Sequence, residues 1–253
     1  MVGLFHFLLR LACGLSAAMA VTSPRLVTSG YYRNNLYVVL GLNVLAALIA
    51  WSSPSDAALA TWSAITAAVL SYVGAVLWLY EQPKPGVVVL TLIAIVTLMG
   101  LWLSAAGYVD TAGSIGVLRW LEPVASAALL GTTMAAMLLG HWYLNSPSMK
   151  LAPLDRLIVL MGLAVIVRGV VCGLGLSMLF ASDTPLTVTH TALLTMRWLA
   201  GLVGPAIMAW MSWQTLRIPN TQSATGILYV GVIGVFLGEM IAALLSGELG
   251  YPI

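Results

Sequence analysis

Long apolar segments decide what this chain can fold into. Proline, glycine, asparagine and charged residues divide the sequence into eight such segments, each about as long as a helix that crosses some 30 Å of hydrocarbon. They cover residues 3–21, 34–51, 58–80, 87–107, 118–143, 154–180, 188–216 and 224–246. Strands of a membrane barrel would be shorter and would alternate apolar with polar residues, which these segments do not. We therefore predict an all-α integral membrane protein with eight transmembrane helices.

Composition indicates one membrane domain and excludes several other classes. Apolar residues make up 61% of the chain and charged residues 7%, whereas roughly a quarter of a soluble domain is charged. We therefore expect residues 1–253 to form a single polytopic domain, neither a soluble enzyme nor a nucleic-acid-binding protein. The first segment resembles a signal peptide, but it lacks a basic start and contains Arg10, so we expect it to be retained as the first helix.

Basic residues concentrate in alternate connections between the segments. The first, third, fifth and seventh connections hold Arg25, Arg33, Lys84, Lys150, Arg156 and Arg217. The other side is mainly acidic and holds Arg119, Glu122, Asp56, Asp110, Asp183 and Glu248. Positively charged connections face the cytoplasm in membrane proteins. The pattern predicts that both termini lie outside, in a multi-pass protein of a bacterial plasma membrane.

A repeated spacing suggests two related halves. A Ser-Pro turn followed nine residues later by arginine occurs twice, at Ser23-Pro24 with Arg33 and at Ser146-Pro147 with Arg156. The repeat is four helices long, so two halves at about residues 1–110 and 111–253 would share one orientation. Ser-Pro turns are common, and coincidence therefore remains the alternative.

Four charged residues fall inside apolar segments, namely Arg10, Arg168, Arg197 and Glu239. A charge inside a membrane costs a few kcal/mol or more and marks a candidate functional site. Helix geometry places three of them in the outer half of the membrane, with Arg168 beneath them. His6 and His190 lie above them, near the outer surface.

Three buried arginines opposite one buried glutamate predict excess positive charge, which suits an anionic or electron-rich guest. For a quinol, Glu239 or His190 would accept a proton while Arg197 or Arg10 holds a carbonyl oxygen and Trp198 lines the apolar wall. For a b-type haem, His6 and His190 would be axial ligands, with the arginines at the propionates. We expect no other metal site. The alternative is that the charges only join helices together.

Two short motifs in the last quarter of the chain carry a family resemblance. Met196-Arg197-Trp198 begins one apolar segment, and Leu237-Gly238-Glu239-Met240-Ile241 lies in the next. With the eight-helix layout, they resemble the membrane anchor subunits of dimethyl sulfoxide reductase and polysulfide reductase. The chain departs from that pattern at Ala242-Ala243, where the family often has Gly-Arg.

The resemblance implies an integral subunit of a respiratory complex, in contact with lipid and with redox subunits that carry iron–sulfur or cytochrome centres. It would exchange electrons and protons with quinone at an outward-facing site, through the residues named above. A small transporter, with Arg168 and Glu239 as its switch, is one alternative. A helix broken near the midplane would favour the transporter, and only Gly204-Pro205 is a candidate for such a break. A structural or assembly subunit is the other.

Overall fold

A computed structural model describes residues 2–52, 58–105, 114–146, 149–182, 185–218 and 220–253, and these form helices, turns and short connections without a strand. The helices are α1 (Val2–Val21), α2 (Ser29–Trp51), α3 (Ala58–Leu79), α4 (Pro83–Ala105), α5 (Ser114–Asn145), α6 (Ala152–Ala181), α7 (Val188–Trp198), η2 (Leu199–Val203), α8 (Gly204–Arg217) and α9 (Thr221–Leu249). With α7, η2 and α8 counted as one span, eight helical spans among the described residues are long and apolar enough to cross a membrane. The predicted fold class is confirmed to that extent.

The helix ends differ from the predicted limits where the sequence breaks were over-interpreted. Pro83 and Pro85 suggested a connection, yet α4 begins at Pro83. Proline is tolerated in the first turn of a helix because the amide it lacks would have no intrahelical partner there. Similarly, α2 begins at Ser29 rather than near residue 34, and its first turns bury Tyr31 and Tyr32 completely.

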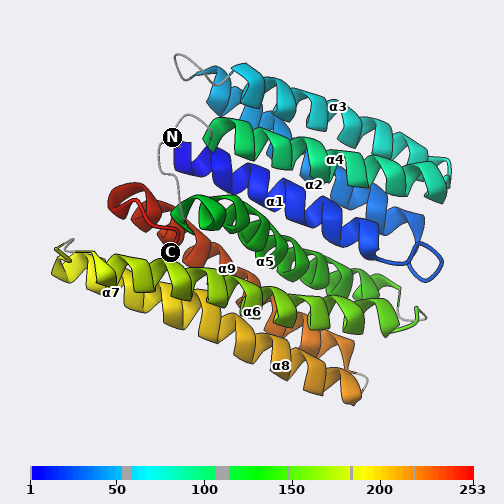
Figure 1. The fold of residues 1–253 in the computed structure, drawn as a ribbon. Coiled ribbons are helices and arrows are strands. Elements are labelled where there is room, and N and C mark those ends of the chain that lie inside the picture. The colour runs from blue at the N-terminus through cyan, green and yellow to red at the C-terminus, as the bar shows by residue number, and fades with distance from the viewer. Residues whose placement is uncertain (1, 53–57, 106–113, 147–148, 183–184, 219) are drawn as a thin grey trace.

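The helices lie roughly side by side, with α1–α4 on one side of the bundle and α5–α9 on the other (Figure 1). Helix α1 packs against α2 and α4 and also against α5, while α5 packs against α6 and α9. At the α1–α5 crossing, a β-carbon on Gly14 would overlap the backbone of Ala127, and one on Gly131 would overlap Gly14. Glycine at both positions lets the two backbones touch. Duplication of the halves remains a prediction.

Pro205 is accommodated without a break in its helix. Five π-helical residues, Leu199–Val203, lie between α7 and α8, and Pro205 stands in the first turn of α8. A π-helical turn widens the helix and rearranges its hydrogen bonds, which absorbs the missing proline donor. The helical path is continuous from Val188 to Arg217, so the chain does not unwind at the Gly204-Pro205 pair.

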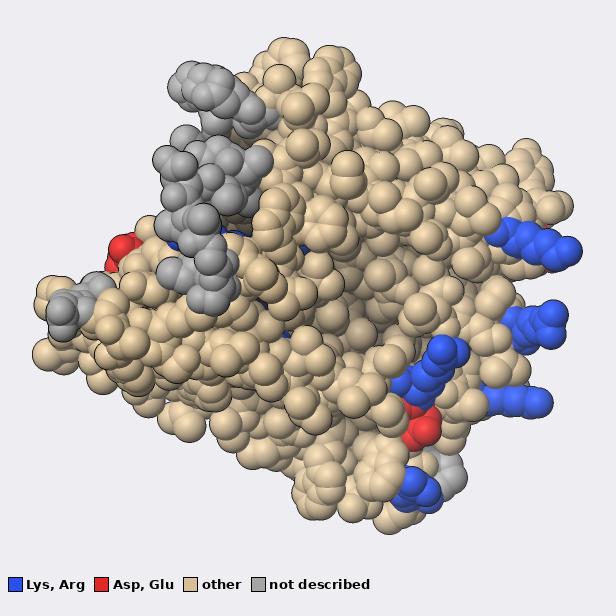
Figure 2. Space-filling view, in the orientation of Figure 1, with Lys and Arg blue, Asp and Glu red and all other residues tan. Residues whose placement is uncertain are grey.

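Basic side chains gather at one end of the bundle (Figure 2). They belong to the α1–α2, α3–α4, α5–α6 and α8–α9 ends, and the chain termini lie together at the opposite end (Figure 1). Asp56, Asp110, Asp183 and Pro147, which contributed to the predicted charge asymmetry and repeat, lie outside the described residues. Which end faces the cytoplasm remains a prediction.

Candidate functional site

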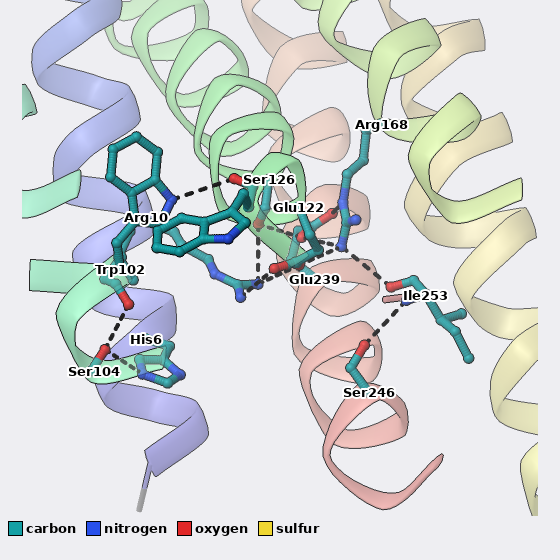
Figure 3. Close-up of polar contacts among 12 residues, drawn as sticks. His6, Arg10, Trp102, Ser104, Glu122, Ser126, Arg168, Glu239, Ser246 and Ile253 are labelled. Atoms are coloured by element: carbon teal, nitrogen blue, oxygen red, sulfur yellow. Dashed lines mark hydrogen bonds and ion pairs between the residues drawn. The ribbon is translucent and has the colours of Figure 1, made fainter. Parts of the chain in front are cut away.

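Five buried or nearly buried charged residues form one connected network in the end of the bundle that holds the termini: Arg10, Glu122, Arg168, Arg197 and Glu239. Figure 3 shows the part of it around Arg10, Glu122, Arg168 and Glu239. Its first pair joins α1 to α5. Arg10 donates from Nη1 to Oε1 of Glu122 at 2.8 Å and from Nη2 to Oε2 at 2.7 Å. This two-pronged geometry matches the planar guanidinium to the carboxylate. The side chains are 12% and 10% exposed, so the pair lies at the edge of the interior.

Arg168 of α6 connects this pair to the second carboxylate. Its Nη2 lies 3.1 Å from Oε1 of Glu122 and 3.1 Å from Oε2 of Glu239, and its Nε lies 3.0 Å from Oε1 of Glu239. The Arg168 side chain is completely buried. A single guanidinium therefore links α5, α6 and α9 in the interior of the bundle.

Glu239 of α9 is the most heavily engaged carboxylate. Besides Arg168, it accepts a hydrogen bond from Nη2 of Arg197 at 2.9 Å and from Oγ of Ser126 at 2.5 Å. Arg197 Nη2 also donates to Sγ of Cys172 at 3.2 Å. Glu239 is 1% exposed and Arg197 is completely buried. Pairing of this kind is what allows charges to remain in a low-dielectric interior.

Glycine packing closes the bundle around Arg197. A β-carbon on Gly201 of η2 would lie 2.6 Å from Cα of Gly238, and it would lie 2.7 Å from Nη1 of Arg197. A β-carbon on Gly238 would also meet Gly201 and the same guanidinium. Only residues without a side chain let η2 approach α9 this closely beside a large cation. The π-helical segment thus seals one side of the network.

The predicted charge balance of the site was wrong. Glu122 was assigned to the outer surface, but α5 buries it between Arg10 and Arg168. Three arginines therefore face two glutamates, and the formal excess is one positive charge rather than two. A signal for Glu122 existed in the sequence, because it lies within the predicted segment 118–143, one helical turn before the polar Ser126.

A pocket of about 480 Å³ opens beside the Arg10–Glu122 pair. This volume lies in the usual range for small-molecule sites. Its polar lining includes His6, Arg10 and Glu122, and its aromatic lining includes Trp102, Trp120 and Tyr251. Trp102 of α4 packs edge-on against Trp120 of α5, with ring centroids 5.6 Å apart, and donates from Nε1 to the Trp120 carbonyl at 3.3 Å. The pocket thus lies between the two groups of helices.

Of the other predicted site residues, His6 lines the pocket, whereas His190 and Trp198 do not. His6 lines the pocket and pairs through Nε2 with Ser104 at 2.8 Å. His190 does not line it. That imidazole completes the capping box of α7 with Thr187 and lies 3.1 Å from Glu248. Trp198 packs in the cluster around Cys172 rather than in the pocket.

The structure separates the two histidines that were predicted as haem ligands. Only one of the two proposed haem ligands, His6, lines the pocket. Among the described residues, no group of three or more His, Cys, Asp or Glu is arranged to hold a metal ion. Nε of Arg10 is buried and has no hydrogen-bond partner among the described residues, while other atoms of Arg10 line the pocket. A buried donor of this kind is costly unless a ligand or water occupies it.

Comparisons with known protein families, with curated proteins and with solved structures found no match.

Proposed function

We propose that this protein binds a quinone head group in the pocket beside Arg10 and Glu122, as the membrane subunit of an electron-transfer complex. The observation that supports it most is the pocket lining. A guanidinium, a carboxylate and an imidazole lie together with three aromatic side chains. A quinone has the matching chemistry, with carbonyl oxygens that accept hydrogen bonds, a ring that packs on aromatic groups, and protons to exchange on reduction and oxidation.

Each pocket residue has a role in this proposal. Arg10 donates to a carbonyl oxygen of the bound ring and holds the charge of Glu122. Glu122 exchanges the proton, because it is the carboxylate that lines the pocket, whereas Glu239 does not. His6, fixed by Ser104, serves as the second polar contact in place of His190. Arg168, Arg197 and Glu239 hold the position of Glu122 from the buried side.

The proposed setting follows from the charge distribution and the resemblance. The basic end of the bundle faces the cytoplasm of a bacterial plasma membrane by the positive-inside rule, and the pocket end then faces outward. A partner subunit with iron–sulfur or cytochrome centres exchanges electrons with the quinone. This part of the proposal rests on the resemblance of the last two spans to reductase anchor subunits.

A structural subunit is the second candidate, and one observation favours it. Every buried arginine of the network reaches a carboxylate, and together the contacts join α1, α5, α6, α7 and α9. A transporter is less well supported. Its coupling site would use unwound backbone near the midplane, whereas the span with Pro205 remains helical throughout.

A binding experiment tests the quinone proposal directly. Decylubiquinone and menadione are titrated into the detergent-solubilised protein, and tryptophan fluorescence reports occupancy of the pocket beside Trp102 and Trp120. Because a charge-assisted hydrogen bond is worth about 1.5–3 kcal/mol, Arg10→Lys should weaken binding about tenfold or more. Arg156→Gln, at the opposite end of the bundle, is the matched control and should bind as the wild type does.

Two results would overturn the proposal. Either the wild-type protein binds neither quinone at concentrations that saturate known quinone sites, or Arg10→Lys and Arg156→Gln bind equally well.

Gentle purification followed by mass spectrometry tests the complex, since redox subunits should copurify. A visible spectrum tests haem. A Soret band that disappears in His6→Ala would replace quinone with haem as the guest.

A further inference from the structure

The segment after α9 turns back into the bundle instead of leaving it. Gly250 ends α9 in a left-handed conformation with φ of 76°, and its amide donates to the Ser246 carbonyl at 3.1 Å. This reversal needs glycine because other residues are strained there. Arg119 of α5 then donates from Nη2 to the Gly250 carbonyl at 2.9 Å. The turn is therefore held to α5 as well as to α9.

The end of this segment is anchored in the interior. Ile253 is completely buried in an apolar cluster with Leu179, Leu194, Ile241 and Leu245. Its amide donates to Oγ of Ser246 at 3.2 Å, and its carbonyl oxygen accepts from Nη2 of Arg168 at 3.3 Å (Figure 3). The same guanidinium nitrogen bonds Glu122 and Glu239. The segment thus supplies a backbone acceptor to the centre of the charged network.

One glycine of α6 makes room for the segment. A β-carbon on Gly175 would overlap the carbonyl group of Pro252. Gly169 lies on the same helix, but a β-carbon added there would meet only open space. Gly250, Tyr251 and Pro252 also form part of the pocket lining. The position of the segment, and with it the shape of the pocket, therefore depends on Gly175.

We propose that residues 250–253 form a built-in wall of the ligand pocket, and that Gly175 and Ile253 are positioning residues which hold this wall against α6 and Arg168. With the wall in place, Tyr251 and Pro252 complete the site, and the Ile253 carbonyl keeps Arg168 directed at the two glutamates. When the wall is displaced, the pocket opens towards Arg168 and admits water. The identity of the ligand rests on the quinone proposal, but the wall itself does not.

Thiol labelling tests the wall without any ligand. A reporter cysteine replaces Ala243, which lines the pocket, while the native Cys13 and Cys172 are both buried. Adding Gly175→Ala overpacks the α6 contact, which should raise the rate of labelling by N-ethylmaleimide about fivefold or more. Gly169→Ala on the same helix is the matched control and should leave the rate unchanged. Equal rates in the two double variants would overturn the proposal.

A second variant keeps the test decisive if Gly175→Ala folds poorly. Ile253→Ala removes the buried anchor without changing any residue of α6, so it should raise the same labelling rate, and an unchanged rate would contradict the wall. Decylubiquinone affinity separates the two proposals. If the wild type binds it, Gly175→Ala should weaken binding and Gly169→Ala should not. If the wild type does not bind it, the quinone proposal fails, and the labelling result still decides the wall.

Discussion

The two ends of the charged network use the same chemistry in different surroundings. Arg10 and Glu122 keep 12% and 10% of their side-chain surface exposed and line a pocket. Glu239 and Arg197 are linked to this pair through Arg168. They are 1% and 0% exposed and are enclosed by η2. We call these the pocket pair and the sealed pair. The two pairs thus share their chemistry but differ in burial, because one borders a pocket and the other is enclosed by helices.

Arg168 connects the two pairs. Arg168 donates hydrogen bonds to both glutamates. A change of charge at Glu122 therefore changes how strongly Arg168 is attracted to Glu239. The sealed pair is not fully satisfied, because Nε and Nη1 of Arg197 have no hydrogen-bond partner among the described residues. Three guanidinium groups offer more donors than two carboxylates can accept. The sealed pair is therefore strongly dependent on its one carboxylate.

The largest effect is expected from Glu239→Gln, which breaks the sealed pair. The amide keeps the shape of the side chain but leaves Arg168 and Arg197 with too little negative charge. Removing one partner of a buried ion pair costs about 3–5 kcal/mol. The free energy of unfolding can be measured by circular dichroism as SDS is titrated into detergent micelles. If Glu239→Gln lost no more stability than Glu122→Gln, the distinction between the two pairs would be wrong.

A smaller loss is expected from Gly238→Ala, which disturbs the seal rather than the charges. The new β-carbon would meet the backbone of Gly201 and the Arg197 guanidinium. Overpacking of this kind costs about 1–3 kcal/mol. Gly226→Ala, on the same helix but with open space around it, should be neutral or gain up to about 1 kcal/mol from helix propensity. Equal stability of the two variants in the same SDS titration would show that η2 does not seal the network.

The sequence predicted the helices well because their signal is local. A run of about twenty apolar residues has few alternatives in a membrane, and the predicted segment 3–21 coincides with the observed first span. The limits failed at Pro83, where a helix-breaking residue began a helix. In that case the context of the first turn mattered more than the residue type.

The site was harder to predict because it depends on which helix faces which. Arg10, Arg168, Arg197 and Glu239 were found as anomalies in apolar segments, and the structure does bring them together. Glu122 was missed because Arg119 lies one turn before it, which made that end of α5 look like a polar surface. The pocket walls from residues 250–252 had no sequence signal, since only the fold returns that segment to α5 and α6.

Glu122→Gln sharpens the comparison from the pocket side. Arg168 keeps Glu239, and Arg10 lies against a pocket into which water can enter, so the expected loss of stability is about 1–2 kcal/mol. The loss should be clearly smaller than that of Glu239→Gln in the same SDS titration. If the quinone proposal is right, Glu122→Gln should also weaken quinone binding, and the loss in binding free energy should exceed the loss in the free energy of unfolding. The opposite ranking would mean that Glu122 belongs to the structural core and that the pocket pair has no separate role.

The smallest effect is expected from Glu248→Gln, which provides a reference ion pair outside the network. Glu248 is 51% exposed and lies 3.1 Å from His190, whose side chain is 18% exposed and which forms an ion pair with it only when the imidazole is protonated. Solvent and salt screen such a pair, so it contributes about 0–1 kcal/mol, and less at high ionic strength. Unfolding of Glu248→Gln and wild type should coincide at high salt and differ slightly at low salt. A salt-insensitive loss as large as that of Glu122→Gln would show that exposure does not set the strength of these pairs, and the contrast between the pocket pair and the sealed pair would lose its physical basis.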